Sequence, residues 1–167
     1  GWGDALTQDY KQAMLWYKRA AKKGHTEAKY NIGVLYEQGT GTAIDYGRAL
    51  QWYKSAAEQG HATAQFNLGN MYSKGAGTAV NQGMAFYWYD RAANQGDADS
   101  QLNLANRYAK GEGIAQNLIE AYKWYLIAED NGIATARDNL THIQEFMSDD
   151  ETSTARELRK AWQPKRE

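Results

Sequence analysis

The chain has 167 residues, of which 43% are hydrophobic and 23% are charged, and its formal net charge is −1 at pH 7. These fractions are typical of folded proteins, and the apolar stretches stop well short of a membrane-spanning length, which argues against wholesale disorder and direct membrane insertion. Scattered lysines and arginines argue against nucleic acid as a partner, and the absence of cysteine excludes disulfides and thiolate sites while leaving the cellular compartment open.

One nine-residue motif recurs along the chain with a period of 36 residues. It reads WYKRAAKKG at 16–24, WYKSAAEQG at 52–60, WYDRAANQG at 88–96 and WYLIAEDNG at 124–132. Self-similarity at a fixed period is typical of repeat arrays. The sequence therefore predicts an array divided into a partial repeat at 1–24, repeats at 25–60, 61–96 and 97–132, and a terminal segment at 133–167.

The first repeat is predicted to be incomplete. Gly3 and Asp9 fall on the same repeat positions as Gly39 and Asp45, so we expect the chain to begin inside a loop and Asp9 to cap the first helix. This leaves that helix without its partner. The hypothesis that follows is a missing upstream half-repeat in a longer natural protein.

Each full repeat is predicted to hold two antiparallel helices. The second helix of a unit, about 46–59, begins after the N-cap Asp45 and ends at Gly60, while the first helix of the next unit covers about 62–74. The glycine-rich stretch GAGTAVN at 75–81 connects this first helix to the second helix of its own unit, and no strand pattern occurs. We expect alanine and glycine to allow close helix contacts, with Tyr53 and Trp52 filling the spaces between helix pairs.

The C-terminal segment departs from the repeat pattern. SDDE at 148–151 has the form of a capping box, and Ala155, Leu158 and Trp162 share one helix face before Pro164. The sequence therefore predicts a last helix that caps the array.

The stretch AQFNLGNMYSKGAGTAVNQGMAFYWYDRAANQG at 64–96 resembles the Sel1-like repeat (SLR), a relative of the tetratricopeptide repeat, and the resemblance covers about Gly3 to Leu140. It implies an all-α fold, a right-handed α-α superhelix whose first helices line a concave face. It also implies an adaptor or scaffold role, and favours a periplasmic or exported bacterial protein while leaving the cytoplasm open. Some family members link each helix pair by a disulfide, which this chain cannot do.

No motif in the sequence predicts catalysis. The glycine loops lack the strand and the Lys-Ser or Lys-Thr sequel of a phosphate-binding loop, so we interpret them as turns between helices. His25 and His61 share a repeat position at a helix start, and we expect them to serve that start rather than a zinc site. Asp149, Asp150 and Glu151 are interpreted as complementing a helix dipole. We therefore predict no enzyme activity and no cofactor or metal.

One side of the first helices is predicted to form a partner-binding face. An asparagine side chain both donates and accepts, so a row of them can hold the main chain of an extended peptide, and apolar neighbours can select its side chains. The alternative, that each asparagine bonds to the adjacent repeat's backbone, stays open. The candidate residues are Tyr30, Asn31, Val34, Phe66, Asn67, Asn70, Lys74, Leu102, Asn103, Asn106 and Lys110.

These observations predict a scaffold that binds a partner protein or peptide on its concave face. The alternative is a structural subunit of a bacterial envelope or signalling assembly that oligomerises through its convex face or its solenoid end. A hydrolase acting on cell-wall material is a third hypothesis, kept because such activity has been proposed within the resembled family. The sequence predicts neither the identity of the partner nor the oligomeric state.

Overall fold

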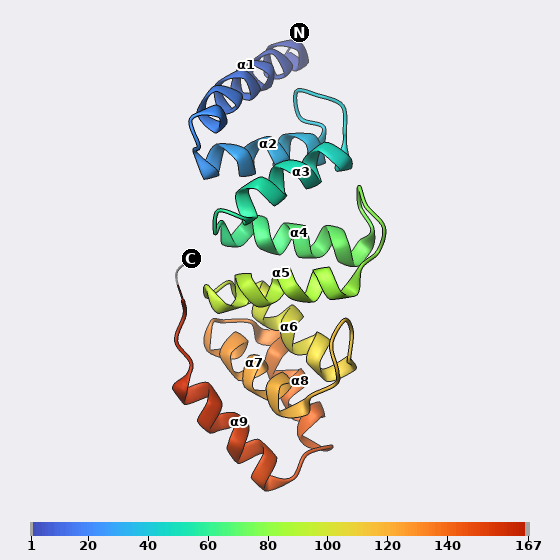
Figure 1. Cartoon of the computed structure of the whole chain (residues 1–167), viewed down its shortest axis with the longest axis vertical. Helices are drawn as coiled ribbons and strands as arrows, with labels where there is room; N and C mark the ends of the chain where they lie inside the picture. The colour runs from blue at the N-terminus through green and yellow to red at the C-terminus, as the bar shows by residue number, and fades with distance from the viewer. Residues whose placement is uncertain (1, 166–167) are drawn as a thin grey trace. The chain divides into compact units, whose positions relative to one another are not determined.

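The computed structural model describes residues 2–165, with side chains described from Asp9 onward, so Gly1 and residues 166–167 of the predicted end segments lie outside it. Within the described residues the chain forms nine helices and no strand (Figure 1). It divides into two compact units, one ending at Val80 and one starting at Asn81. The helices are α1 (Trp2–Lys22), α2 (Thr26–Gln38), α3 (Tyr46–Ala57), α4 (Ala62–Lys74), α5 (Gln82–Asn94), α6 (Ala98–Lys110), α7 (Leu118–Asp130), α8 (Ala134–Gln144) and α9 (Asp149–Ala161).

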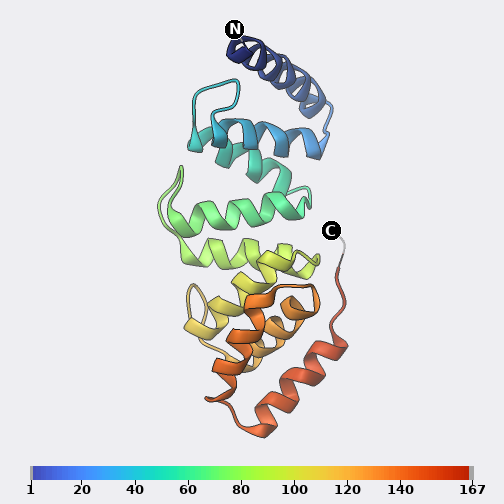
Figure 2. The ribbon, with the colours of Figure 1, turned by 180° about the vertical axis from the view of Figure 1, so that it is seen from behind.

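Each unit is built from helices that pack on their neighbours in chain order. In the first unit α2 packs against α1 and α3, and α3 packs against α4. In the second unit α6 packs against α5 and α7, while α7 also contacts α8 and α9. Figure 2 shows α9 at the edge of the second unit, followed by the chain's C-terminal segment. Across the described part of the chain, no helix combines the length and the apolarity needed to cross a bilayer.

Polar side chains cap the second helix of each hairpin as predicted. Asp45, Asn81 and Asn117 each accept a hydrogen bond from the backbone N–H three residues later, at 2.9 to 3.0 Å. These bonds satisfy amides that lack a partner at a helix N-terminus. The predicted cap at Asp9 is wrong, because α1 continues through it from Trp2. Ala5 stands at the repeat position of Gly41, so the second glycine of the other loops is replaced by a strong helix former.

The second glycine of each loop is required by a close approach of two backbones. A Cβ atom at Gly77 would lie inside van der Waals contact of the Tyr46 carbonyl, and one at Gly113 would meet the Gln82 carbonyl in the same way. Both glycines also adopt positive φ angles, 71° and 79°. The loop can therefore pack on the start of the preceding second helix only because no side chain is present there. The interpretation of these loops as turns is confirmed.

Small residues and tyrosines form the core of the repeats. Ala49, Tyr53, Ala56 and Ala57 expose no surface, and a Cβ atom at Gly33 would lie 2.6 Å from the Tyr53 ring. The ring therefore rests directly on the backbone of α2. This confirms the predicted role of Tyr53 as a filler between helices.

The tryptophan positions differ in burial, which the periodicity does not indicate. Trp88 and Trp124 are each 3% exposed, Trp52 is half-buried, and Trp16 is 63% exposed. The repeat position alone does not bury an indole, because burial depends on which further segment packs over the second helices. Trp124 has such a segment, since Trp162 packs on it with a ring-centroid distance of 5.6 Å.

The C-terminal helix confirms the predicted capping box. Ser148 accepts from the Glu151 backbone N–H, and the Glu151 carboxylate accepts from the Ser148 backbone N–H at 2.8 Å. Ala155 is buried and Trp162 is half-buried, but Leu158 is 40% exposed, so its predicted place on the packed face is wrong. The packed face is centred on Thr152 and Ala155 and leaves Leu158 at its edge.

We expect Ala56→Leu to lower the free energy of unfolding by about 1 to 3 kcal/mol, because extra atoms at a fully buried helix contact force the backbones apart. Ala79→Leu, in an exposed loop position, is the matched control and should change little. Urea denaturation of both variants measures the difference. Equal stability of the two variants would contradict the close-packing assignment.

The capping box predicts an acid-dependent loss of stability. Hydrogen bonds from the Ser148 backbone, and then from its side chain, lower the pKa of Glu151. A carboxyl with a lowered folded-state pKa stabilises the fold above its ordinary pKa, and that contribution disappears as the pH falls through the folded-state value. Thermal melting should therefore show Glu151→Ala less stable than the parent at pH 7, with the difference shrinking as the pH falls below the ordinary range of a glutamate carboxyl.

Candidate functional site

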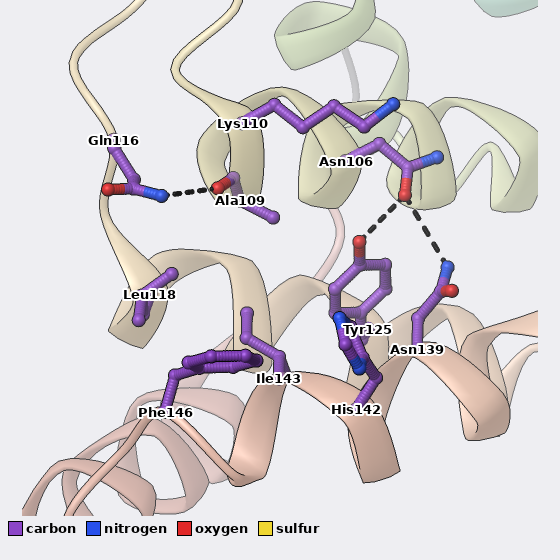
Figure 3. A pocket seen from close by; sticks show the side chains of 10 residues that line it. All are labelled: Asn106, Ala109, Lys110, Gln116, Leu118, Tyr125, Asn139, His142, Ile143 and Phe146. Atoms are coloured by element: carbon purple, nitrogen blue, oxygen red, sulfur yellow. Dashed lines mark hydrogen bonds between the residues drawn. The ribbon is translucent and has the colours of Figure 1, made fainter.

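The second unit contains a pocket of about 700 Å³ between α6, α7 and α8 (Figure 3). The first helices of two consecutive hairpins, α6 and α8, form its sides, and α7 contributes residues from its start and its middle. The pocket is lined by Asn106, Ala109, Lys110, Gln116, Leu118, Tyr125, Asn139, His142, Ile143 and Phe146.

The side-chain oxygen of Asn106 lies at the base of the pocket and accepts two hydrogen bonds. The buried Tyr125 hydroxyl donates to Asn106 Oδ1 at 2.7 Å, and Asn139 Nδ2 donates to the same oxygen at 3.4 Å. Burial raises the pKa of Tyr125 to about 12, so the hydroxyl remains a donor at neutral pH. Asn106 thereby links α6 to both α7 and α8 and holds the pocket open in one geometry.

One wall of the pocket is apolar. Leu118, Ile143 and Phe146 face the same space in Figure 3, and the Phe146 side chain is 65% exposed. The His142 ring lies edge-on to Phe146 at 5.4 Å between centroids. An exposed aromatic held by a neighbouring ring offers contact area at a small cost in side-chain entropy.

The rim of the pocket carries hydrogen-bonding and charged groups. Gln116 Nε2 donates to the Ala109 carbonyl at 2.8 Å, which ties the loop before α7 to the end of α6. The exposed Lys110 side chain extends along the opposite side (Figure 3). A pocket with one apolar wall and oriented polar groups at its base and edge suits an apolar side chain whose main chain or carboxylate is held at the rim.

The structure brings two predicted site residues, Asn106 and Lys110, into this pocket. Leu102 is partly buried against the core of the second unit. Asn103 Nδ2 donates to the Asp99 carbonyl of its own helix at 2.9 Å. Neither of the last two residues lines the pocket.

In the first unit the predicted residues surround a ring cluster. Tyr30 stacks on His61 at 4.6 Å between centroids and lies 5.8 Å from the Tyr53 ring. The Tyr53 hydroxyl donates to Glu37 Oε2 at 2.6 Å, and Asn67 bonds to the hydroxyls of both Tyr30 and Tyr53. Burial, followed by the bond to Glu37, raises the pKa of Tyr53.

The remaining predicted residues of this unit have individual surroundings. Asn31 Nδ2 donates to the Glu27 carbonyl of its own helix at 3.0 Å, as Asn103 does in the second unit. Val34, Phe66 and Asn70 are half-buried, and Lys74 is exposed. The bonds formed by Asn31 and Asn103 are local to one helix, so they differ from the inter-repeat backbone bonds of the structural hypothesis.

His61 serves a helix start as predicted, whereas His25 makes no side-chain cap. The Ala64 N–H donates to His61 Nδ1 at 3.1 Å, which assigns the proton to Nε2 in the neutral ring, where it points to Glu27 Oε2 at 2.9 Å. Among the residues whose side chains are described, no group of three or more His, Asp or Glu residues is placed to hold a metal ion.

Sequence reasoning missed most of the pocket wall. His142 and Phe146 lie 36 residues after Asn106 and Lys110, but they stand in the terminal segment, where the residue types depart from the repeat, so they are not among the predicted residues. Gln116 was interpreted only as part of a loop. Sequence reasoning also missed Gln65 and Gln101. Both side chains are fully buried, and they donate to the carbonyls of Ala57 and Ala93 at the end of the preceding helix.

The family comparison identifies repeats throughout most of the chain. The model described as Sel1 repeat matches residues 1–25, 26–61, 62–97 and 98–133. Proteins of this family are generally protein-interaction scaffolds, and they are typically helical-repeat proteins without enzymatic activity. None of the curated proteins matches the sequence significantly.

Three solved structures show the same repeat fold. A Sel1 repeat protein from Oxalobacter formigenes is 35% identical with a TM-score of 0.74, over 78% of this chain and 54% of its own. A protective antigen of uropathogenic Escherichia coli with an SLR fold is 25% identical with a TM-score of 0.57, over 88% and 39%. Helicobacter pylori cysteine-rich protein B is 21% identical with a TM-score of 0.63, over 81% and 97%. The matched region thus spans about half of the first protein and less of the second.

The hydrogen bonds predict different roles for two neighbouring asparagines. Asn106→Ala leaves the buried Tyr125 hydroxyl without its acceptor and should lower the free energy of unfolding by about 1 to 3 kcal/mol. Asn103→Ala removes a bond within one helix and should cost less than about 0.5 kcal/mol. Chemical denaturation of the two variants checks this ranking, and the reverse order would refute it.

Proposed function

The chain belongs to the Sel1 repeat family, and we propose that it works as a protein-interaction module that binds an extended segment of a partner protein on the face formed by the first helices of its hairpins. The observation that supports this most is the pocket between α6, α7 and α8. Its volume is in the range typical of ligand sites and leaves room for more than one side chain, and its lining combines an apolar wall with polar groups at the base and the rim.

In this proposal the apolar and the charged residues of the pocket contact different parts of the partner. Leu118, Ile143 and Phe146 receive an apolar side chain of the partner. Lys110 attracts a carboxylate at the rim, and the exposed position of its ammonium keeps this attraction moderate. Asn106 offers its Nδ2 rather than its oxygen to the partner, because the oxygen already accepts from Tyr125 and Asn139.

The first unit contributes a second recognition surface on the equivalent helices. Tyr30 and Phe66 supply aromatic area, and Val34 extends it on α2. Asn31, Asn67, Asn70 and Lys74 add polar groups around these side chains, as Asn103 and Lys110 do beside Leu102 on α6. In this proposal the aromatic and apolar groups provide affinity, and the amides orient the bound segment.

One observation favours the alternative role as a subunit that associates through its convex face. Leu15 and Trp16 on α1 are 58% and 63% exposed, which is unusual for adjacent large apolar side chains. Convex-face contacts and peptide binding in the pocket are compatible, since they use different helices.

We expect Phe146→Ala to weaken binding of a pocket-selected peptide by about tenfold or more, because exposed aromatic anchors dominate contact energies. Peptides are first selected from a random peptide library on the whole chain and should carry an apolar residue near an acidic one. Their affinity is then measured by fluorescence anisotropy against the parent and the variant.

The matched control is Val80→Ala, because Val80 is similarly exposed, at 59%, but lies in a loop of the other unit. It should leave the affinity unchanged. Selected peptides that bind both variants as tightly as the parent would contradict the pocket mechanism, and failure of any peptide to be selected would favour the convex-face alternative.

A further inference from the structure

A cleft of about 360 Å³ lies between α1 and α3 in the first unit, away from the pocket described above. Leu15, Lys18, Arg19 and Lys22 of α1 line one side, and Trp52 of α3 lines the other. The cleft therefore combines an indole surface with three cationic side chains. Such a combination points to a ligand that is both apolar and anionic.

The second unit has equivalent positions two repeats later, on α5 and α7, and we call them the equivalent cleft. Adding 72 to each residue number gives Tyr87, Asp90, Arg91, Asn94 and Trp124. The local geometry is repeated as well. The Arg19 guanidinium lies over the Trp16 ring at 5.0 Å, and the Arg91 guanidinium lies over the Trp88 ring at 5.4 Å.

In the second unit the chain's own C-terminal segment packs on residues of this equivalent cleft. Trp162 packs on Trp124 at 5.6 Å between ring centroids, and the Lys165 N–H donates to the Asn94 carbonyl at 2.7 Å. Figures 1 and 2 both show this segment running from α9 past α7 to the end of α5. An extended Trp-Gln-Pro-Lys segment is thus a ligand that this type of cleft accepts.

The glycine that follows the helix, Gly96 in the second unit and Gly24 in the first, also has different surroundings in the two units. A Cβ atom at Gly96 would lie 3.7 Å from Pro164 Cβ, whereas a Cβ atom at the equivalent Gly24 would meet nothing within 4 Å. The first unit therefore has room for such a segment where the second unit is already covered.

The charges of the two clefts are opposite at one position. Burial raises the pKa of Asp90, while the nearby positive charges of Lys123 and Lys165 act to lower it. Asp90 is replaced by Lys18 in the first unit, and Asn94 is replaced by Lys22. In the first unit, Lys18 would therefore repel a basic ligand residue at the position equivalent to Lys165 and attract an acidic one.

We propose that the α1–α3 cleft binds an extended segment of a partner protein in which an aromatic residue is followed, three positions later, by an acidic one. The aromatic side chain packs on Trp52 as Trp162 packs on Trp124. The main chain reaches the Lys22 carbonyl at the end of α1, and the acidic side chain faces Lys18. The C-terminal segment of a second copy is a poor occupant, because it carries Lys165 at the discriminating position and already packs on its own α5 and α7.

The test compares two labelled peptides, acetyl-AWQPE-amide and acetyl-AWQPK-amide, by fluorescence anisotropy on the whole chain. The first should bind about tenfold more tightly than the second, because one contact changes from repulsive to attractive. Lys18→Glu should invert this preference, and Trp52→Ala should weaken both peptides by about tenfold or more. Lys54→Glu, a charge reversal at an exposed side chain that does not line the cleft, should leave both affinities unchanged.

Circular dichroism confirms that each variant is folded, and Lys18→Glu keeps the test decisive if Trp52→Ala does not fold. Equal affinity of the two peptides, no binding of either, or an unchanged preference in Lys18→Glu would overturn the proposal. Retention on phosphatidylserine vesicles combined with equal peptide affinities would also overturn it, in favour of a lipid surface. None of these outcomes depends on the pocket between α6, α7 and α8.

Discussion

The repeats depend on contacts in which an aromatic ring lies directly on a backbone that has little or no side chain. The Tyr53 ring occupies the space that a Cβ atom at Gly33 would need, and alanines at Ala49 and Ala56 keep the neighbouring surfaces equally close. Because this contact is short, the helices cannot slide without a clash. The arrangement fixes which face of each first helix remains available for binding.

The same constraint explains which parts of the structure the sequence predicts well. Helix bounds, caps such as Asp45 and the turn at Gly77 are determined within one repeat, so the period of 36 residues predicts them. Asp9 shows the limit of this reasoning, because an N-cap requires a turn before it and the stretch around Gly3 does not supply one. The exposure of Trp16 shows a second limit, since burial of that position depends on a segment from outside the repeat.

The candidate site is less predictable because it is built where the periodicity ends. Asn106 and Lys110 are predicted to lie on the binding face, whereas His142 and Phe146 occupy the same two positions one period later, in a terminal segment whose residue types no longer follow the repeat. The role of Asn106 was also not apparent from its position. Its oxygen accepts from a tyrosine of the next helix, a contact that no pattern within one helix encodes.

A repeat protein offers an internal comparison that other folds lack, since equivalent positions differ only in sequence and in what covers them. In the second unit the C-terminal segment supplies Trp162 and the Lys165 backbone to the groove between α5 and α7, and the Trp124 ring is buried as a result. In the first unit the aromatic surface persists while the charge at position 18 is reversed relative to Asp90. Preservation of the apolar contact with reversal of the charge is the pattern expected when two related clefts select different ligands.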